Sequence, residues 1–248
     1  MATNSAIEWT QATWNPVTGC DKVSPGCAHC YAERMAHRLQ AMRQRNYADG
    51  FAVRVHEHML EHPLRWKKPL RIFVNSMSDL FHPEVPRAFI ARVFATMHRA
   101  NWHHYQILTK RSERLLELDD MLPWAEHIWM GVSIENQRHA FRADDLRRTR
   151  ACIKFLSLEP LLGPVSLDLT GIDWVIVGGE SGPGARAMDP QWVGAIQDEC
   201  ATQGVRFFFK QWGGVFKKRQ GREFGGRTWN EMPRSFTAES NSVRTEKI

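Results

Sequence analysis

The sequence predicts an α/β fold: a partial or complete parallel (β/α) TIM-like barrel of six to seven units, with a small basic C-terminal hairpin extension. Short apolar segments alternate with longer segments of helical periodicity along most of the 248 residues, which is the pattern of a sheet covered by helices. The apolar segments are continuous, as expected of strands that are buried on both faces of a parallel sheet. A chain of this length has the size of one such barrel.

The predicted strands and helices follow one another in order. The segments expected to be strands are 7–14, 71–75, 105–109, 128–133, 153–157, 174–178 and 205–210. The segments expected to be helices are 31–45, 84–100, 112–118, 136–150 and 190–202. In the first helix, Met35, Leu39 and Met42 recur at helical spacing and predict an apolar face.

The chain is expected to divide into three parts. Residues 1–212 form the barrel with an N-terminal cysteine loop, residues 213–234 a basic glycine-rich hairpin, and residues 235–248 a disordered tail. Lys217, Lys218, Arg219 and Arg222 of the hairpin suit a polyanion, and a solvated hairpin that covers the barrel explains them equally well.

Composition narrows the class of protein and its compartment. Hydrophobic residues make up 43% of the chain, which suits a globular protein, and no apolar run approaches the roughly 18 residues of a membrane span. Five cysteines, three of them clustered, do not predict a disulfide framework, so we expect the reducing cytoplasm. The net charge of +6 and the ten tryptophans favour a nucleic-acid partner, although an ordinary solvated basic surface explains the same charge.

The first predicted strand leads into a loop with three cysteines in eleven residues. Cys20, Cys27 and Cys30 have the spacing C-x6-C-x2-C, and a helical pattern begins straight after Cys30. Helix N-termini favour thiolates. An iron–sulfur cluster normally takes four cysteine ligands, so a cluster on these three keeps one iron open. The alternatives are a structural zinc site completed by a histidine such as His29, and plain buried cysteines.

The cysteine loop resembles that of the radical S-adenosylmethionine (SAM) superfamily. The matching residues are Asn15-Pro-Val-Thr-Gly-Cys20 and Gly26-Cys27-Ala-His-Cys30-Tyr-Ala, and the similarity is greatest to the spore photoproduct lyase-like branch. The whole chain resembles an uncharacterised three-cysteine family that is common in phage and prophage genomes. The usual spacing in the superfamily is C-x3-C-x2-C, so this chain has three extra residues in the first gap, and His29 stands where an aromatic residue is usual.

This resemblance implies a [4Fe-4S] cluster and SAM as cofactors, and an enzyme. The open iron would chelate the amino and carboxylate groups of SAM, and an electron from a reductant protein such as a flavodoxin or ferredoxin would cleave SAM to methionine and a 5′-deoxyadenosyl radical. That radical would abstract hydrogen from an unknown substrate, for which the basic surface favours nucleic acid or a nucleotide.

Polar residues follow the C-terminal end of each predicted strand, which is the end that carries the site in parallel barrels. These groups are Asn75 to Asp79, Thr109 to Arg111, Ser133 to Glu135, Ser157 to Glu159, Gly178 to Gly182, and Lys210 with Gln211. The cysteine loop also follows a strand, so we expect all of them on one rim. Cys152 and Cys200 precede their strands, and we expect them to be packing residues at the opposite end.

The chemistry of SAM suggests where its parts would bind, since its ammonium needs acceptors, its carboxylate a cation and its ribose a bidentate acceptor. In the resembling branch, a Ser/Thr-Asp pair and a Thr-Lys pair end the second and third strands; Ser78-Asp79 and Thr109-Lys110 match them. We therefore expect Ser76, Ser78 and Asp79 near the amino acid part, Lys110 near its carboxylate, and Ser133 and Glu135 near the ribose. Polar loop residues that cap helices explain the same pattern.

A glycine-rich loop, Gly178 to Arg186, follows the predicted strand 174–178. Its N–H groups suit an anion, and we expect Gly179 and Glu180 to face adenosine or substrate; a turn without a ligand is the alternative. The sequence leaves two other functions open. One is a non-catalytic nucleic-acid-binding protein with a structural zinc site, and the other is a metal-dependent hydrolase on a barrel, which lacks a His-x-His after the first strand.

Overall fold

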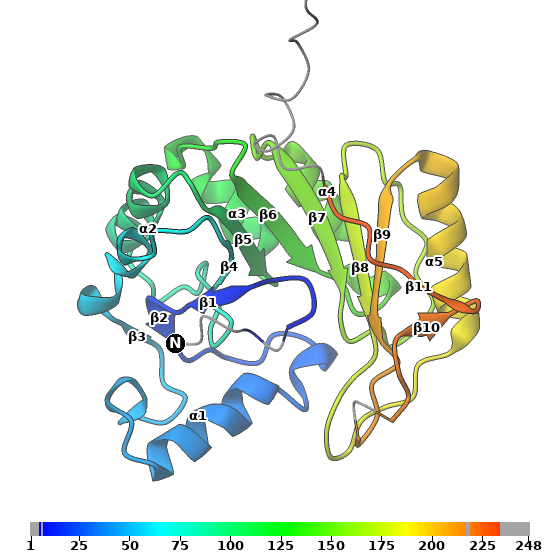
Figure 1. Ribbon diagram of the computed structural model, residues 1–248, viewed down its shortest axis with the longest axis horizontal. Helices are drawn as coiled ribbons and strands as arrows, with labels where there is room; N and C mark the ends of the chain where they lie inside the picture. The colour runs from blue at the N-terminus through cyan, green and yellow to red at the C-terminus, as the bar shows by residue number, and fades with distance from the viewer. Residues whose placement is uncertain (1–4, 6, 217–218, 234–248) are drawn as a thin grey trace, which may run out of the picture.

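The computed structural model describes residues 5, 7–216 and 219–233. Its centre is a seven-stranded sheet in the order β1-β4-β5-β6-β7-β8-β9, with every neighbouring pair parallel. The strands are β1 (Ala12–Trp14), β4 (Arg71–Val74), β5 (His104–Thr109), β6 (Ile128–Ser133), β7 (Ile153–Leu158), β8 (Trp174–Gly178) and β9 (Arg206–Gln211). The sheet curls into a half-barrel (Figure 1), which confirms the predicted partial parallel barrel.

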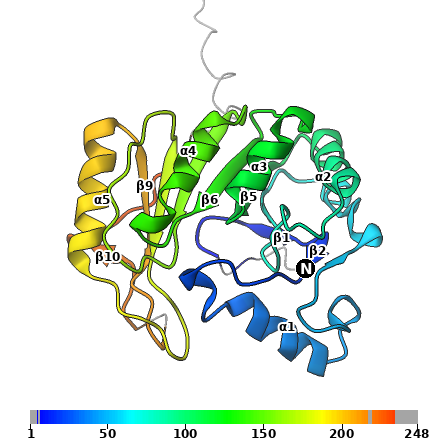
Figure 2. The same cartoon turned by 180° about the vertical axis from the view of Figure 1, so that it is seen from behind.

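Four helices cover the outer face of this sheet (Figures 1 and 2). They are α2 (Arg87–Arg99), α3 (Ser112–Leu118), α4 (Phe141–Arg148) and α5 (Pro190–Gln203). α5 shows why such helices begin and end where they do. The Asp189 carboxylate accepts the Gln191 N–H at its start, and Gly204 ends it with φ +69°, a conformation that glycine adopts without strain.

A mainly aromatic cluster, separate from the main hydrophobic core, fills the concave face of the sheet. It consists of Trp9, Phe73, Trp129, Phe155, Trp174, Ile176 and Phe208. Six of these belong to strands, where alternate residues point to opposite faces. Trp9 reaches the cluster from the N-terminal segment, with its ring centroid 4.7 Å from that of Phe73. The interior of the half-barrel is therefore packed at this level.

The first helix, α1 (Tyr31–Ala41), lies at the end of the sheet where the strands finish, apart from the outer helices (Figure 1). Its buried residues are Ala32 and Ala36, which pack with Met77 of the loop after β4. Of the predicted apolar face, Leu39 is partly buried against these residues, but the prediction is wrong for Met35 and Met42, which are 42% and 58% exposed. Two alanines suffice because the helix covers a loop and not the sheet.

Some predicted boundaries and burials also differ. The first strand covers only the end of the predicted 7–14, and α1 stops before the predicted residue 45, where Arg43 adopts φ +55°. The predicted helix 136–150 begins as a 3-10 turn, and α4 proper starts at Phe141. Cys200 is buried in α5 as predicted, but the prediction for Cys152 is wrong: it is exposed, just before β7 begins.

Short elements complete the fold. β2 (Val17–Thr18) pairs antiparallel with β3 (Arg54–Val55), and β10 (Glu223–Phe224) with β11 (Arg227–Thr228), inside the segment predicted as a hairpin. The 3-10 helices are η1 (Pro25–Cys27), η2 (Arg45–Tyr47), η3 (Glu57–Met59), η4 (His62–Arg65), η5 (Asp119–Met121) and η6 (Gln137–His139). Lys217, Lys218 and the predicted tail lie outside the described residues. Within the described ranges, none of the helices has the length and apolar character that a membrane crossing requires.

Candidate functional site

A cavity of about 410 Å³ opens at the carboxyl ends of the parallel strands. All three clustered cysteines line it, together with polar residues from the end of every strand from β4 to β9. Of the predicted site residues, it is lined by Ser76, Ser78, Asp79, Lys110, Ser133, Gly179 and Glu180. Glu135 is not among the lining residues. The prediction that the cysteine loop and the polar strand ends share one rim is confirmed.

Backbone geometry fixes the start of the cysteine loop. Gly19 has φ +84°, and a Cβ atom there would lie 2.2 Å from the carbonyl oxygen of Ala52, so no other residue fits. η1 carries Cys27, and Cys30 stands directly before α1. The loop thus presents its cysteines from a turn, a short 3-10 helix and a helix N-terminus, and all three side chains are partly exposed.

The Cys20 thiol is held in its neutral form. Burial, and then the negative charge of Asp79, raise its pKa to about 12, and Arg111, whose Nη2 lies 3.8 Å from the sulfur, opposes this shift. A metal ion binds the thiolate form of a cysteine, so a metal that bound Cys20 would displace the thiol proton.

Asp79 is a hub for the loop after β4. Its carboxylate accepts hydrogen bonds from the Thr109 hydroxyl at 2.7 Å, the Phe81 N–H at 2.9 Å and the Lys110 N–H at 3.1 Å. Ser76 and Ser78 are also occupied: the Ser76 hydroxyl donates to the Asn15 side chain and the Ser78 hydroxyl to the Val17 carbonyl. The loop that we predicted to meet the SAM amino acid is therefore braced against β5 and against the segment before the cysteines.

Glu135 is fully buried directly beneath the cysteine loop. Its carboxylate lies 2.7 Å from the Lys110 ammonium and 3.0 Å from Nη1 of Arg142, and it accepts the Ser24 hydroxyl at 2.5 Å. Burial alone would raise the pKa of Glu135, but Lys110 and the other partners outweigh it, so the pKa lies below its usual value. A Cβ atom on Gly26 would lie 2.5 Å from Glu135 Cγ, so this glycine lets the cysteine loop rest on the carboxylate.

Glu180 holds the other side of the same loop. Arg186 donates to its carboxylate through Nε, Nη2 and the backbone N–H, and His29 Nδ1 lies 3.1 Å away. Burial opposes ionisation of Glu180, but these hydrogen bonds outweigh it and lower its pKa to about 2. Arg186 therefore balances the charge of Glu180. Because Arg186 also donates to the carbonyl of Pro25, this ion pair helps to position the cysteine loop.

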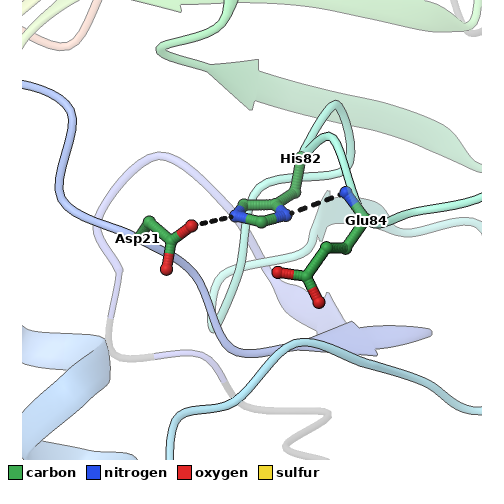
Figure 3. A group of neighbouring side chains, drawn as sticks. All are labelled: Asp21, His82 and Glu84. Atoms are coloured by element: carbon green, nitrogen blue, oxygen red, sulfur yellow. Dashed lines mark hydrogen bonds and ion pairs between the residues drawn. The ribbon is translucent and has the colours of Figure 1, made fainter.

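Asp21, next to Cys20, contacts a histidine for which the sequence carries no signal (Figure 3). His82 is 1% exposed; its Nε2 lies 2.9 Å from the Asp21 carboxylate, and its Nδ1 accepts the backbone N–H of Glu84 at 3.2 Å. Potential ligand atoms of Asp21, His82 and Glu84 lie within 4.8 Å of one another. Since Nδ1 accepts, the ring hydrogen of neutral His82 lies on Nε2 and points at Asp21, so both nitrogens are used and the group fastens the cysteine loop.

The spacing of the sulfurs bears on the kind of metal site. A tetrahedral zinc with Zn–S bonds of about 2.3 Å brings its sulfurs within about 4 Å of one another. Among the described residues, Cys20, Cys27 and Cys30 do not form a group with ligand atoms within 4.8 Å. His29, the expected fourth zinc ligand, is engaged by Glu180. In a cubane each cysteine binds a different iron, so its sulfurs need not lie as close together as around a single zinc.

The predicted polyanion side chains of the hairpin are partly used inside the fold. Arg222 donates to the carbonyls of Phe209 and Lys210 and to the Asn230 side chain, so it holds the hairpin on β9. Arg219 is exposed and lies 4.8 Å from the centre of the exposed Phe216 ring.

Comparison with known proteins assigns the chain to a family. A family model described as "Protein of unknown function (DUF5131)" matches residues 4–233, and the chain belongs to this family. No curated protein and no solved structure matches the chain.

Proposed function

We propose that this protein is a radical SAM enzyme, with a [4Fe-4S] cluster on Cys20, Cys27 and Cys30. The observation that carries the proposal is that these three cysteines line the same cavity as the polar ends of the parallel strands. The chain's other two cysteines lie elsewhere: Cys152 just before β7 begins, and Cys200 in the last turn of α5, which leads into β9. A cluster here would therefore keep one iron without a cysteine ligand.

The residues present fit such a group. Three thiols come from one short loop, and that loop is fastened on three sides, by Asp21 to His82, by Ser24 to Glu135 and by Pro25 to Arg186. When bound, the cluster and SAM would supply a carbon-centred radical, which is chemistry that protein side chains do not provide. The chain's own part is to orient the cofactors and to keep water out.

In this proposal the rim residues bind SAM. The Lys110 ammonium would hold its carboxylate, and the buried Glu135 would position that ammonium from behind. Ser76, Ser78 and the carbonyls of the loop braced by Asp79 would receive the amino group and Ser133 the ribose, while Gly179, which follows β8, would face the substrate. Glu180, balanced by Arg186, would act by placing the cysteine loop.

The partners and compartment belong to the same proposal. A cluster of this kind would need a reductant protein such as a flavodoxin or ferredoxin, and we propose the cytoplasm as the compartment. The net charge of +6 favours nucleic acid or a nucleotide as substrate. Within the hairpin segment, the Arg219 and Phe216 pair offers a cation and an exposed ring to such a ligand.

Anaerobic reconstitution with iron, sulfide and a reductant tests the proposal. The protein is expected to take up about four irons, turn brown and form 5′-deoxyadenosine from SAM. Cys27→Ala should lose the cluster and the product. Cys152→Ala is the matched control, since that thiol is exposed away from the cavity, and it should keep both. A colourless protein that carries one zinc and gives no 5′-deoxyadenosine would refute the enzyme and favour the zinc-containing binding protein.

A further inference from the structure

The cavity has a second polar region, away from β4, β5 and β6, which carry the residues proposed to bind SAM. It is formed by Ser157 and Glu159 at the end of β7, and by Lys210 and Gln211 at the end of β9. β8 lies between these strands and ends in Gly178, where a Cβ would lie 3.3 Å from Glu159 and 3.4 Å from Lys210. Because Gly178 has no side chain, Lys210 can form an ion pair with Glu159 across β8.

Several buried polar atoms in this region have no partner among the described residues. They are Ser157 Oγ, Gln211 Oε1, Glu159 Oε1 and Trp9 Nε1. Ser157 is 1%, Gln211 5% and Trp9 2% exposed, and all of these residues line the cavity. A buried polar group without a partner is costly, and where several of them line one cavity, a ligand or ordered water there would supply the missing hydrogen bonds.

The charge and shape of the region restrict that ligand. Lys210 is balanced by Glu159, and the free carboxylate oxygen would repel a phosphate, so the bound group is not an anion. The unpartnered atoms include the acceptor oxygens of Glu159 and Gln211 and the hydroxyl of Ser157, so a matching ligand donates several N–H bonds. The indole N–H of Trp9 needs an acceptor on the same ligand. Trp9, whose ring also contacts Phe155 of β7 and Trp174 of β8, adds an apolar wall that suits a flat ring.

We propose that this region binds the substrate's nucleobase, one that carries an amino group, as guanine, adenine and cytosine do. This inference rests on the proposed function, because SAM is taken to occupy the side of β4, β5 and β6. Ser157, Glu159 and Gln211 accept from the exocyclic amino group, and in guanine also from the neighbouring ring N–H, and Trp9 donates to a ring nitrogen or carbonyl. Thymine lacks the amino group and has a single N–H on its pairing edge, so it would leave more of these acceptors unpaired.

Calorimetric titration of the full-length protein, reconstituted or as purified, tests this assignment. The probes are guanosine, adenosine, cytidine, thymidine and SAM. At least one amino-bearing nucleoside should bind more tightly than thymidine. Ser157→Ala should raise its Kd about three- to tenfold, the effect of one lost hydrogen bond. Ser166→Ala, an exposed serine on the connection between β7 and β8, is the matched control and should leave it unchanged.

Two further readouts distinguish base binding from a role of Ser157 in folding and from SAM binding. The Ser157 hydroxyl has no partner among the described residues, so Ser157→Ala should not lower the thermal midpoint; a lower midpoint would mean that the hydroxyl serves folding and would overturn the assignment. A Kd for SAM that rises as much as that for the nucleoside would assign the region to SAM and would also overturn it. Absence of nucleoside binding, or thymidine binding best, has the same result.

Titrations with an oligonucleotide and with a nucleoside identify the source of the base. A single-stranded oligonucleotide that contains the preferred base and binds more tightly than the nucleoside supports a base within nucleic acid, whereas equal binding supports a free nucleoside. Failure of the proposed function would be seen separately, as a missing cluster or missing 5′-deoxyadenosine, while nucleoside binding is measured on its own.

Discussion

Replacing Glu135 by alanine is the most direct test of how the cysteine loop is held. This carboxylate is 0% exposed and joins two cations, Lys110 and Arg142, whose side chains are 19% and 4% exposed. It also accepts the hydroxyl of Ser24 from the cysteine loop. Glu135→Ala leaves both cations and the hydroxyl without their common partner.

The expected loss of stability in Glu135→Ala follows from the burial of this carboxylate. Removing one member of a buried ion pair costs about 3–5 kcal/mol, because the remaining charge stays away from water. For a chain of this size each kcal/mol lowers the thermal midpoint by about 2–4 °C, so a fall of roughly 6–20 °C is expected. Glu135→Gln keeps the shape and one acceptor oxygen, and it should lose about half as much of the free energy of unfolding.

Urea unfolding, followed by circular dichroism, measures the loss. The matched control is Glu117→Ala, which removes an ion pair with Arg87 whose side chains are 54% and 62% exposed; a change within about 0.5 kcal/mol is expected there. If Glu135→Ala costs no more than Glu117→Ala, the carboxylate does not hold the loop and does not position Lys110.

The same contacts give three further expectations. Gly26→Ala places a Cβ 2.5 Å from Glu135 Cγ and should lower the free energy of unfolding by about 1–3 kcal/mol in urea; an unchanged midpoint would contradict the close approach. Asp79→Ala orphans two N–H groups and a hydroxyl and should cost about 2–5 kcal/mol, with Asp79→Asn in between; equal losses for both would argue against the hub. Glu180 has its pKa lowered from 4.5 to about 2, with Arg186 and His29 as donors, so its contribution is present above pH 4.5 and is lost as the pH falls towards 2. Unfolding midpoints measured across this range should depend less on pH in Glu180→Gln, and an equally steep dependence would exclude the ion pair as its cause.

The parallel sheet, and the end of it that carries the site, could be predicted from the sequence alone. Continuous apolar strands form wherever both faces are buried, and this pattern is local, so segments such as 128–133 and 174–178 match β6 and β8 closely. The meeting of the cysteines with the strand-end residues followed from topology, since parallel strands bring their carboxyl ends to one edge.

Which polar residues face the cavity, and which ones hold it together, depends on the packing of the whole chain. Glu135 and Asp79 have the residue types of ligands, yet one is buried under Gly26 and the other braces β5. Ser24 and Glu135 are 111 residues apart, and Asp21 and His82 are 61 apart. Such contacts depend on how far the sheet curls and where each loop crosses it, and no local pattern in the sequence encodes either property.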